Sequence, residues 1–159
     1  MHLAILTAIV VGVFTFLIVR SLRNAKQTAL PDNRSKHEAF VNADEFDEMV
    51  LETSHKTPVM VDFYAEWCGP CRNLTPLLAK FADDYQGAFL LAKVDVDKNE
   101  QLSQRFGIRA MPTVLLFRDG KSVERFTGAK LPHSIQYILT KHGIHEPKAA
   151  ASNREDLQE

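Results

Sequence analysis

The sequence has few cysteines and no surplus of charge of either sign. Its 159 residues include only two cysteines, Cys68 and Cys71, and 19 lysines and arginines are balanced by 20 acidic residues. A zinc site built from cysteine pairs needs a second pair, so we expect no metal, with the distant His142 and His145 as the alternative ligands. The balanced charge leaves no general basic field, and we therefore expect no nucleic-acid partner.

The two cysteines lie two residues apart in the segment WCGPC, residues 67–71, directly after the apolar run 59–64. At this spacing a mixed disulfide formed at one sulfur is within reach of the other, which suits thiol–disulfide exchange. Two alternatives stay open. A structural disulfide is disfavoured because closing so short a loop removes little entropy from the unfolded chain. An inert pair of buried thiols is disfavoured by Gly69-Pro70, which is typical of a turn at a helix start.

The position of the pair predicts different roles for the two sulfurs. We expect a helix over about 68–85, with Cys68 at its N-terminus and Cys71 almost one turn inside. A helix N-terminus stabilises a nearby anion by roughly 0.3–2 kcal/mol, and about 1.4 kcal/mol corresponds to one pKa unit. The terminus alone therefore lowers the pKa of Cys68 by about one unit. Cys68 is predicted to attack and Cys71 to resolve.

The segment 61–71, VDFYAEWCGPC, closely resembles the active-site strand and helix start of thioredoxins, the family for which redox C-x-x-C motifs are best known. The resemblance continues through residues 92–97, 106–113 and 116–120, ends near Gly128, and covers about residues 40–143. The motifs, their order along the chain and the spacing between them all resemble those of thioredoxins. The resemblance implies a thioredoxin-like three-layer α/β sandwich and a protein-disulfide reductase.

The resemblance also assigns a proton acceptor. Asp62, six residues before Cys68, resembles the buried carboxylate that accepts the proton of the resolving thiol. Desolvation raises the pKa of a carboxyl group, which suits proton transfer near neutrality. Lys93 resembles the lysine that lies near this carboxylate and moderates its pKa. The alternatives are a solvated Asp62 and an ordinary exposed Lys93.

Pro112 resembles the cis-proline that packs against the two sulfurs of the family, and the alternative is a trans proline opening the strand from Thr113. In the family, the backbone of the preceding residue, here Met111, pairs with an extended client segment. One departure is Tyr64, where many members have tryptophan. The residues expected to form an apolar client surface around Cys68 are Trp67, Gly69, Pro70, Met111, Gly128 and Ala129.

Hydrophobic periodicity and turn residues predict the element order independently. Asn42 and Glu45 form a candidate capping box for a first helix, and Pro76 predicts a kink in the helix over 68–85. The remaining expected elements are strands at 59–64 and 89–96, a short helix at 100–106, a hairpin over 113–126 that turns at 119–120, and a helix from Pro132 to Gly143. Parallel strands joined by helices, followed by a hairpin, predict a mixed central sheet with helices on both faces.

The N-terminal region contains an uncharged apolar run, Leu3 to Val19. Its length and hydropathy predict entry into a bilayer, and the basic residues that follow it predict that the redox domain lies on the cytoplasmic side. The alternatives are a cleaved signal peptide and an extracytoplasmic domain. The predicted organisation is an uncleaved transmembrane anchor at 1–22, a polar linker at 23–37, a thioredoxin domain at 38–143 and a flexible tail at 144–159.

The favoured hypothesis is a membrane-tethered thioredoxin that reduces disulfides in client proteins. Its redox group would be the Cys68–Cys71 disulfide itself, with no bound cofactor, and its partners would be client proteins, a membrane through residues 3–19, and a thioredoxin reductase or other dithiol donor. A second hypothesis places the same chemistry outside the cytoplasm, on exported or cytochrome-maturation clients. A third is a non-catalytic module that binds a partner through Trp67 and Met111.

Overall fold

The computed structural model describes residues 36–147. The predicted anchor, most of the predicted linker and residues 148–159 lie outside the described residues. The elements, in chain order, are β1 (Glu38–Phe40), η1 (Asp47–Glu52), η2 (Thr53–His55), β2 (Val59–Tyr64), α2 (Cys71–Asp84), β3 (Leu90–Asp95), α3 (Glu100–Arg105), β4 (Thr113–Arg118), β5 (Lys121–Thr127) and α4 (Pro132–Lys141).

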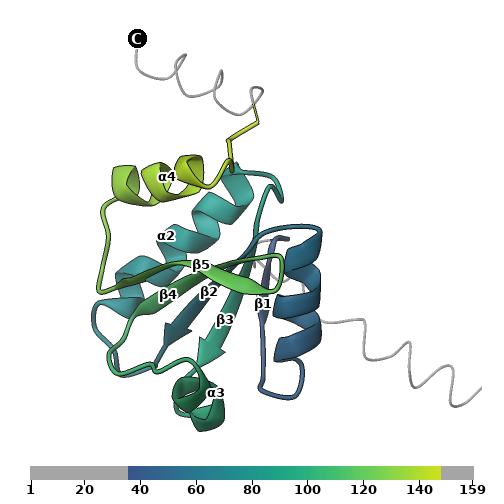
Figure 1. Ribbon diagram of the computed structural model, residues 1–159. Helices are drawn as coiled ribbons and strands as arrows, with labels where there is room; N and C mark the ends of the chain where they lie inside the picture. The colour runs from purple at the N-terminus through teal and green to yellow at the C-terminus, as the bar shows by residue number, and fades with distance from the viewer. Residues whose placement is uncertain (1–35, 148–159) are drawn as a thin grey trace, which may run out of the picture. The chain divides into compact units, whose positions relative to one another are not determined.

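The five strands form one mixed sheet in the order β1-β3-β2-β4-β5, with β2 in the centre (Figure 1). Strands β1, β3 and β2 run parallel, whereas β4 pairs antiparallel with β2 and β5 antiparallel with β4. In this register Asp62 of β2 lies opposite Lys93 of β3 and Val114 of β4. Candidate site residues therefore meet at the centre of the sheet.

Side chains alternate along each strand, so every strand contributes to both faces of the sheet. Helical segments cover both faces (Figure 1). On one face Met60 of β2 packs with Leu78 of α2 and Leu139 of α4. On the other, Phe63 of β2 packs with residues of η1 and α3, including Leu102. The result is the predicted three-layer α/β sandwich.

The local signals behind this fold are visible at several termini. The hairpin turns at Asp119 and Gly120, which both have positive φ angles, 52° and 72°, as a tight two-residue hairpin requires. Helix α4 begins at the predicted Pro132. The expected first helix is a π-helical turn, η1, followed by the 3₁₀ turn η2, and the Asn42 N–H donates to Glu45 Oε2 at 3.4 Å, one half of the predicted capping box.

One predicted boundary is wrong. Helix α2 begins at Cys71 and not at Cys68, so Cys71 is its first residue and does not lie a turn inside. Proline disfavours the helical conformation in the residue before it, here Gly69. Residues 65–70 form turns, with the Cys68 N–H donating to the Ala65 carbonyl at 3.1 Å.

The described residues also bear on the two chain ends. Ile144, the first residue of the predicted tail, is buried and its N–H donates to the Leu139 carbonyl, so the packed domain includes it. Among residues 36–147, no helix combines the length and apolar character needed for a bilayer span. The predicted span, residues 3–19, lies outside this range.

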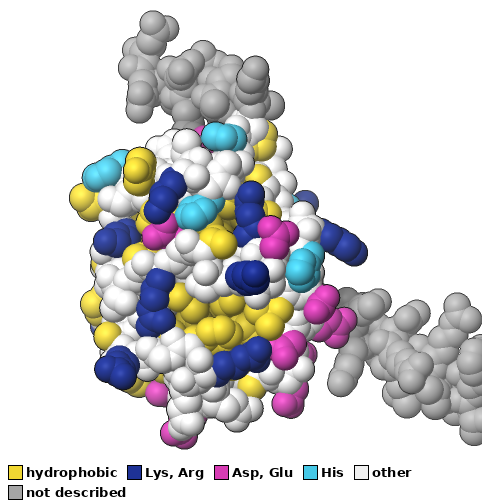
Figure 2. Space-filling model, in the orientation of Figure 1, with side chains coloured by type: hydrophobic (Ala, Val, Ile, Leu, Met, Phe, Trp, Pro, Cys, Tyr) yellow, Lys and Arg dark blue, Asp and Glu magenta, His cyan; other side chains and the backbone are white. Residues whose placement is uncertain are grey.

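On the face shown in Figure 2, basic and acidic side chains are both present and hydrophobic ones gather near the centre.

Candidate active site

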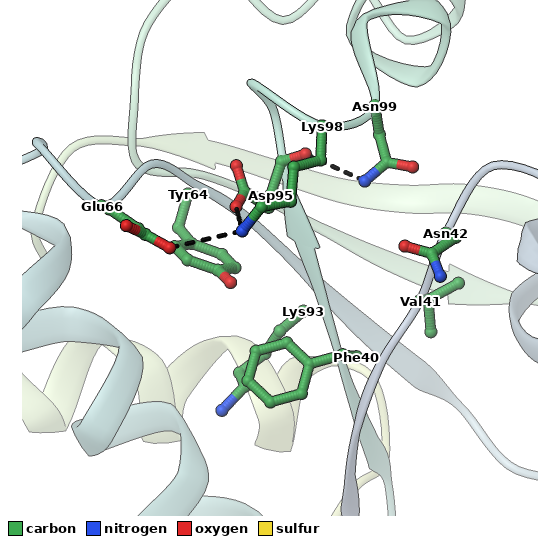
Figure 3. A pocket seen from close by; sticks show the side chains of 9 residues that line it. All are labelled: Phe40, Val41, Asn42, Tyr64, Glu66, Lys93, Asp95, Lys98 and Asn99. Carbon is green, nitrogen blue, oxygen red and sulfur yellow. Dashed lines mark hydrogen bonds and ion pairs between the residues drawn. The ribbon is translucent and has the colours of Figure 1, made fainter.

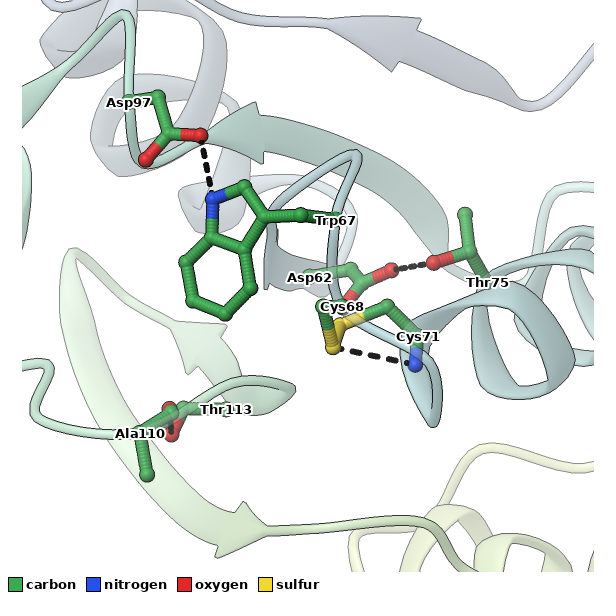
Figure 4. Close-up of a disulfide and its surroundings, with 8 residues drawn as sticks. All are labelled: Asp62, Trp67, Cys68, Cys71, Thr75, Asp97, Ala110 and Thr113. Atoms are coloured by element: carbon green, nitrogen blue, oxygen red, sulfur yellow. Dashed lines mark hydrogen bonds between the residues drawn. A yellow bond between two sulfur atoms is a disulfide. The ribbon is translucent and has the colours of Figure 1, made fainter.

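A disulfide joins Cys68, in the loop after β2, to Cys71, the first residue of α2, with their Cα atoms 5.4 Å apart (Figure 4). The pair packs with Ala65 in a small cluster of its own. Both residues are buried, Cys68 at 4% and Cys71 at 2% exposure. In the oxidised state the two cysteines therefore hardly differ in exposure.

The hydrogen bonds do distinguish the sulfurs. The backbone N–H of Cys71 donates to Cys68 Sγ at 3.2 Å. Cys68 also lies just ahead of the N-terminus of α2, where free N–H groups favour a negative charge. A thiolate at Cys68 would therefore be stabilised by the same N–H and by the helix terminus, as the sequence predicts.

Asp62 is fully buried beneath this pair. Thr75 Oγ1 donates to Asp62 Oδ2 at 2.6 Å, whereas Oδ1 has no hydrogen-bond partner among the described residues. Burial raises the pKa of Asp62 from 3.8 to about 6, opposed by the Thr75 hydrogen bond and by the charge of Lys93. Thr75 follows Cys71 by four residues and so lies on the same face of α2. Thr75 thus holds the Asp62 carboxyl group against the first turns of α2, the helix that begins at Cys71.

Lys93 is nearly buried, at 9% exposure. Its ammonium forms an ion pair with Glu38 Oε2 at 3.1 Å and lies 4.3 Å from the centroid of the Phe40 ring. No ion pair joins Lys93 and Asp62 within the described part of the chain, although the two residues are register partners. The charge of Lys93 lowers the pKa of Asp62, but its ammonium contacts a different carboxylate, that of Glu38.

The Met111–Pro112 peptide bond is cis, as the resemblance implies. Met111 is partly exposed and packs against the cysteine pair. The Pro112 carbonyl accepts the Gly128 N–H at 2.8 Å, and Gly128 has a positive φ of 82° that favours glycine. These contacts bring the loop before β4 and the end of β5 together beside the disulfide.

The remaining predicted surface residues are solvent-facing. Trp67 is 65% exposed, and its indole N–H donates to Asp97 Oδ2 at 2.8 Å (Figure 4). Gly69, Pro70 and Ala129 are exposed as well. The exposed ring of Trp67 is therefore held in one orientation by a charged acceptor.

Sequence reasoning missed three residues at this site: Thr75, Glu38 and Asp97. Thr75 carries a usable signal, because it follows Cys71 by four residues on a helix. Glu38 precedes Lys93 by 55 residues and lies on a strand of three residues, so no local pattern reveals it. Among the described residues, no group of three or more His, Cys, Asp or Glu side chains is arranged to hold a metal ion.

Comparison with known proteins gives consistent matches. The family model described as Thioredoxin matches residues 37–141. Thioredoxin 1 of Nostoc sp. is 38% identical over 104 residues, 65% of this chain and 95% of the relative, and the thioredoxin of Pseudomonas aeruginosa is 39% identical over 95 residues, 60% and 86%. The X-ray structure of Fasciola hepatica thioredoxin superimposes with a TM-score of 0.59 at 36% identity, covering 64% of this chain and 94% of that one.

These relatives correct the predicted localisation. The sequence predicts a single-pass membrane protein with its redox domain on the cytoplasmic side. The relatives are named as thioredoxins, their names mention no membrane, and they align over 95% and 86% of their lengths. The membrane localisation is wrong: hydropathy measures how well an apolar run would enter a bilayer as a helix, not whether the chain uses it so.

The fold, the cysteine pair and the cis-proline thus occur in a chain that matches these relatives over most of their length. The family model alone covers more than half of the 159 residues. The chain belongs to the thioredoxin family, and it is a thioredoxin-type dithiol–disulfide oxidoreductase.

Proposed function

We propose that the protein reduces disulfides in client proteins, with Cys68 as the attacking and Cys71 as the resolving cysteine. The observation that carries this assignment is the hydrogen bond from the Cys71 N–H to Cys68 Sγ, 3.2 Å long. Since a donor to sulfur favours the thiolate, and the thiolate is the nucleophile, the bond supports Cys68 for the first step.

The reaction begins from the reduced dithiol. The Cys68 thiolate attacks one sulfur of a client disulfide, a mixed disulfide forms, and the second client sulfur leaves as a thiolate and takes up a proton. Cys71 then loses its proton and attacks Cys68 Sγ, which closes the Cys68–Cys71 disulfide and releases the client. Two electrons pass to the client, and a dithiol donor such as a thioredoxin reductase restores the pair.

Asp62 is the proposed acceptor for the Cys71 proton. Its pKa of about 6 leaves it mostly ionised at neutral pH yet still able to hold a proton transiently. The unpartnered Oδ1 supports this role, since that oxygen has no competing hydrogen-bond donor among the described residues. Lys93 moderates the pKa of Asp62 through its charge.

The proposed client surface is a rim of exposed and partly exposed residues around the disulfide, with the buried Pro112 behind it. Met111 is the residue whose backbone would pair with an extended client segment, a form of strand addition. The packing of Met111 on the cysteine pair supports this assignment. The other proposed contact residues are Trp67, Gly69, Pro70, Pro112, Gly128 and Ala129.

Reduction of insulin disulfides by the purified protein tests the proposal. We expect turnover with dithiothreitol or with a thioredoxin reductase and NADPH, no turnover for Cys68→Ser, and accumulation of client mixed disulfides on Cys68 for Cys71→Ser. Asp44→Asn, which removes an exposed carboxylate far along the chain from the motif, is the control and should behave as wild type. Absence of insulin reduction by wild-type protein, or full activity of Cys68→Ser, would contradict the proposal.

A further inference from the structure

Three charged side chains lie on the α2 face of the sheet, one on each of three neighbouring strands. Strand β3 lies between β1 and β2, and Lys93 of β3 is the register partner of Phe40 on one side and Asp62 on the other. Glu38, two residues before Phe40 on β1, points to the same face because side chains alternate along a strand. The Lys93 ammonium therefore has a carboxylate on each side.

The Lys93 ammonium forms an ion pair with one of the two carboxylates, that of Glu38. Lys93 Nζ lies 3.1 Å from Glu38 Oε2, and their side chains are only 11% and 5% exposed. Figure 3 shows the Lys93 side chain running behind the Phe40 ring, apart from the group formed by Lys98 with Asp95 and Glu66. A buried ion pair of this kind is weakly screened by solvent.

Within residues 36–147, Asp62 has no ion-pair partner. From α2 it faces the hydroxyl of Thr75, from β4 the apolar Val114, and from β3 Lys93, whose charge lowers its pKa. The attraction of Lys93 is the smallest of the three influences on that pKa, after burial and the Thr75 hydrogen bond. A lysine paired directly with Asp62 would be expected to have a larger effect.

We propose that Glu38 is a positioning residue for thiol–disulfide exchange, since it holds the Lys93 ammonium away from Asp62 and leaves that carboxylate free to accept the Cys71 proton. The inference rests on the proposed role of Asp62. During resolution the Cys71 S–H bond breaks, its proton moves to Asp62, and the new S–S bond to Cys68 forms as the client thiolate leaves. Glu38 takes no part in bond making; it acts through Lys93.

Carbon-13 NMR titration of the Asp62 carboxyl group in the oxidised full-length protein tests this role. In Glu38→Gln the uncompensated ammonium of Lys93 is free to approach Asp62 and favours its ionised form. We expect the titration midpoint of Asp62 to fall by about one pH unit. Glu66→Gln is the matched control, because Glu66 also pairs with a lysine, at 3.3 Å, but is 79% exposed. The titration midpoint of Asp62 in Glu66→Gln should equal that in the wild type.

A second pair of variants tests whether Glu38 acts through Lys93. In a Lys93→Met background, Glu38→Gln should lower the Asp62 midpoint by less than half as much as in the wild type. A folded Glu38→Gln protein with an unchanged or raised midpoint, or an equal fall in both backgrounds, would overturn the proposal. If Glu38→Gln does not fold, Glu38→Asp keeps the charge but shortens its reach, and an unchanged midpoint in that variant would overturn the proposal equally.

Insulin reduction by the same wild-type sample distinguishes a failure of the proposed function from a failure of the proposed role of Glu38. The NMR titration needs no turnover, so it gives an answer even if the protein fails to reduce insulin. An inactive wild type would contradict the proposed function, whereas an active wild type with no Glu38-dependent shift would contradict only the role of Glu38.

Discussion

The two faces of the central sheet differ in what they bury. Under η1 and α3 the face is apolar, and Phe46, Phe63, Phe106 and Phe117 form an aromatic group with ring centroids 4.9–6.0 Å apart. Under the start of α2 the face holds buried polar groups instead. Since burial of an uncompensated charge destabilises a fold, the comparison separates a face that maintains the structure from a region that serves the chemistry.

Asp62 shows how large the difference is. Its pKa rises from 3.8 to about 6 on folding because the carboxyl group is buried. Each pKa unit is worth about 1.4 kcal/mol, so an ionised Asp62 destabilises the folded state by about 3 kcal/mol. A buried leucine or valine at that position would avoid this cost, and the proposed proton transfer would account for a carboxylate there.

Removing a buried ring from the apolar face should change the stability of the protein most. Phe63→Ala should lower the free energy of unfolding by about 3–5 kcal/mol, because a fully buried ring is removed from a packed aromatic group. Urea denaturation measures this. Val123→Ala, at a position 41% exposed, is the control and should change stability by less than about 0.5 kcal/mol. Similar losses for the two variants would contradict the structural role of this face.

Asp62→Asn should raise the free energy of unfolding rather than lower it. Asp62 binds its proton more tightly in the folded than in the unfolded state, so its contribution is most favourable below about pH 4 and is lost as the pH rises through about 6. The variant should therefore be more stable than wild type by about 3 kcal/mol at pH 8 and equal to it near pH 4. Urea denaturation at both pH values checks this, with the exposed Asp44→Asn as control. A stability difference independent of pH would contradict the burial argument.

The smallest expected effect lies at the surface, between β5 and α4. Glu124 accepts from Lys141 Nζ at 2.7 Å and contacts His142 Nε2 at 3.0 Å, and these partners lower the pKa of Glu124. Because solvent screens the group, Glu124→Gln should lower the free energy of unfolding by less than about 1 kcal/mol at pH 7. The cost should disappear as Glu124 is protonated in acid and shrink with added salt. A loss comparable to that of Phe63→Ala would show that charge, not apolar packing, secures this part of the fold.

Much of the fold follows from local signals. Asp119-Gly120 specifies a tight hairpin, Pro132 a helix start, and the apolar run 59–64 a buried strand, and each is found at that position. The start of α2 is less predictable. Gly69-Pro70 indicates a turn, but the apolar pattern does not show that the turn extends to Pro70 before the helix begins.

The site is predictable where chemistry is encoded in a contiguous motif. WCGPC fixes the two cysteines, and the spacing to Asp62 and Pro112 follows from the family resemblance. Glu38 and Asp97 could not be found in this way, because their partners, Lys93 and Trp67, meet them only through tertiary packing. The ion pair of Glu38 depends on strand order, which brings β1 against β3, and no local sequence pattern carries that information.

The proposed mechanism requires Cys68 to be an ionised nucleophile in the reduced protein. The most direct test is the pH dependence of its alkylation by iodoacetamide, with the modified cysteine identified by peptide mass spectrometry. We expect Cys68 to react before Cys71, with a midpoint at or below about pH 7.5, roughly one unit under an ordinary thiol. A midpoint near pH 8.5 at Cys68, or prior modification of Cys71, would contradict it.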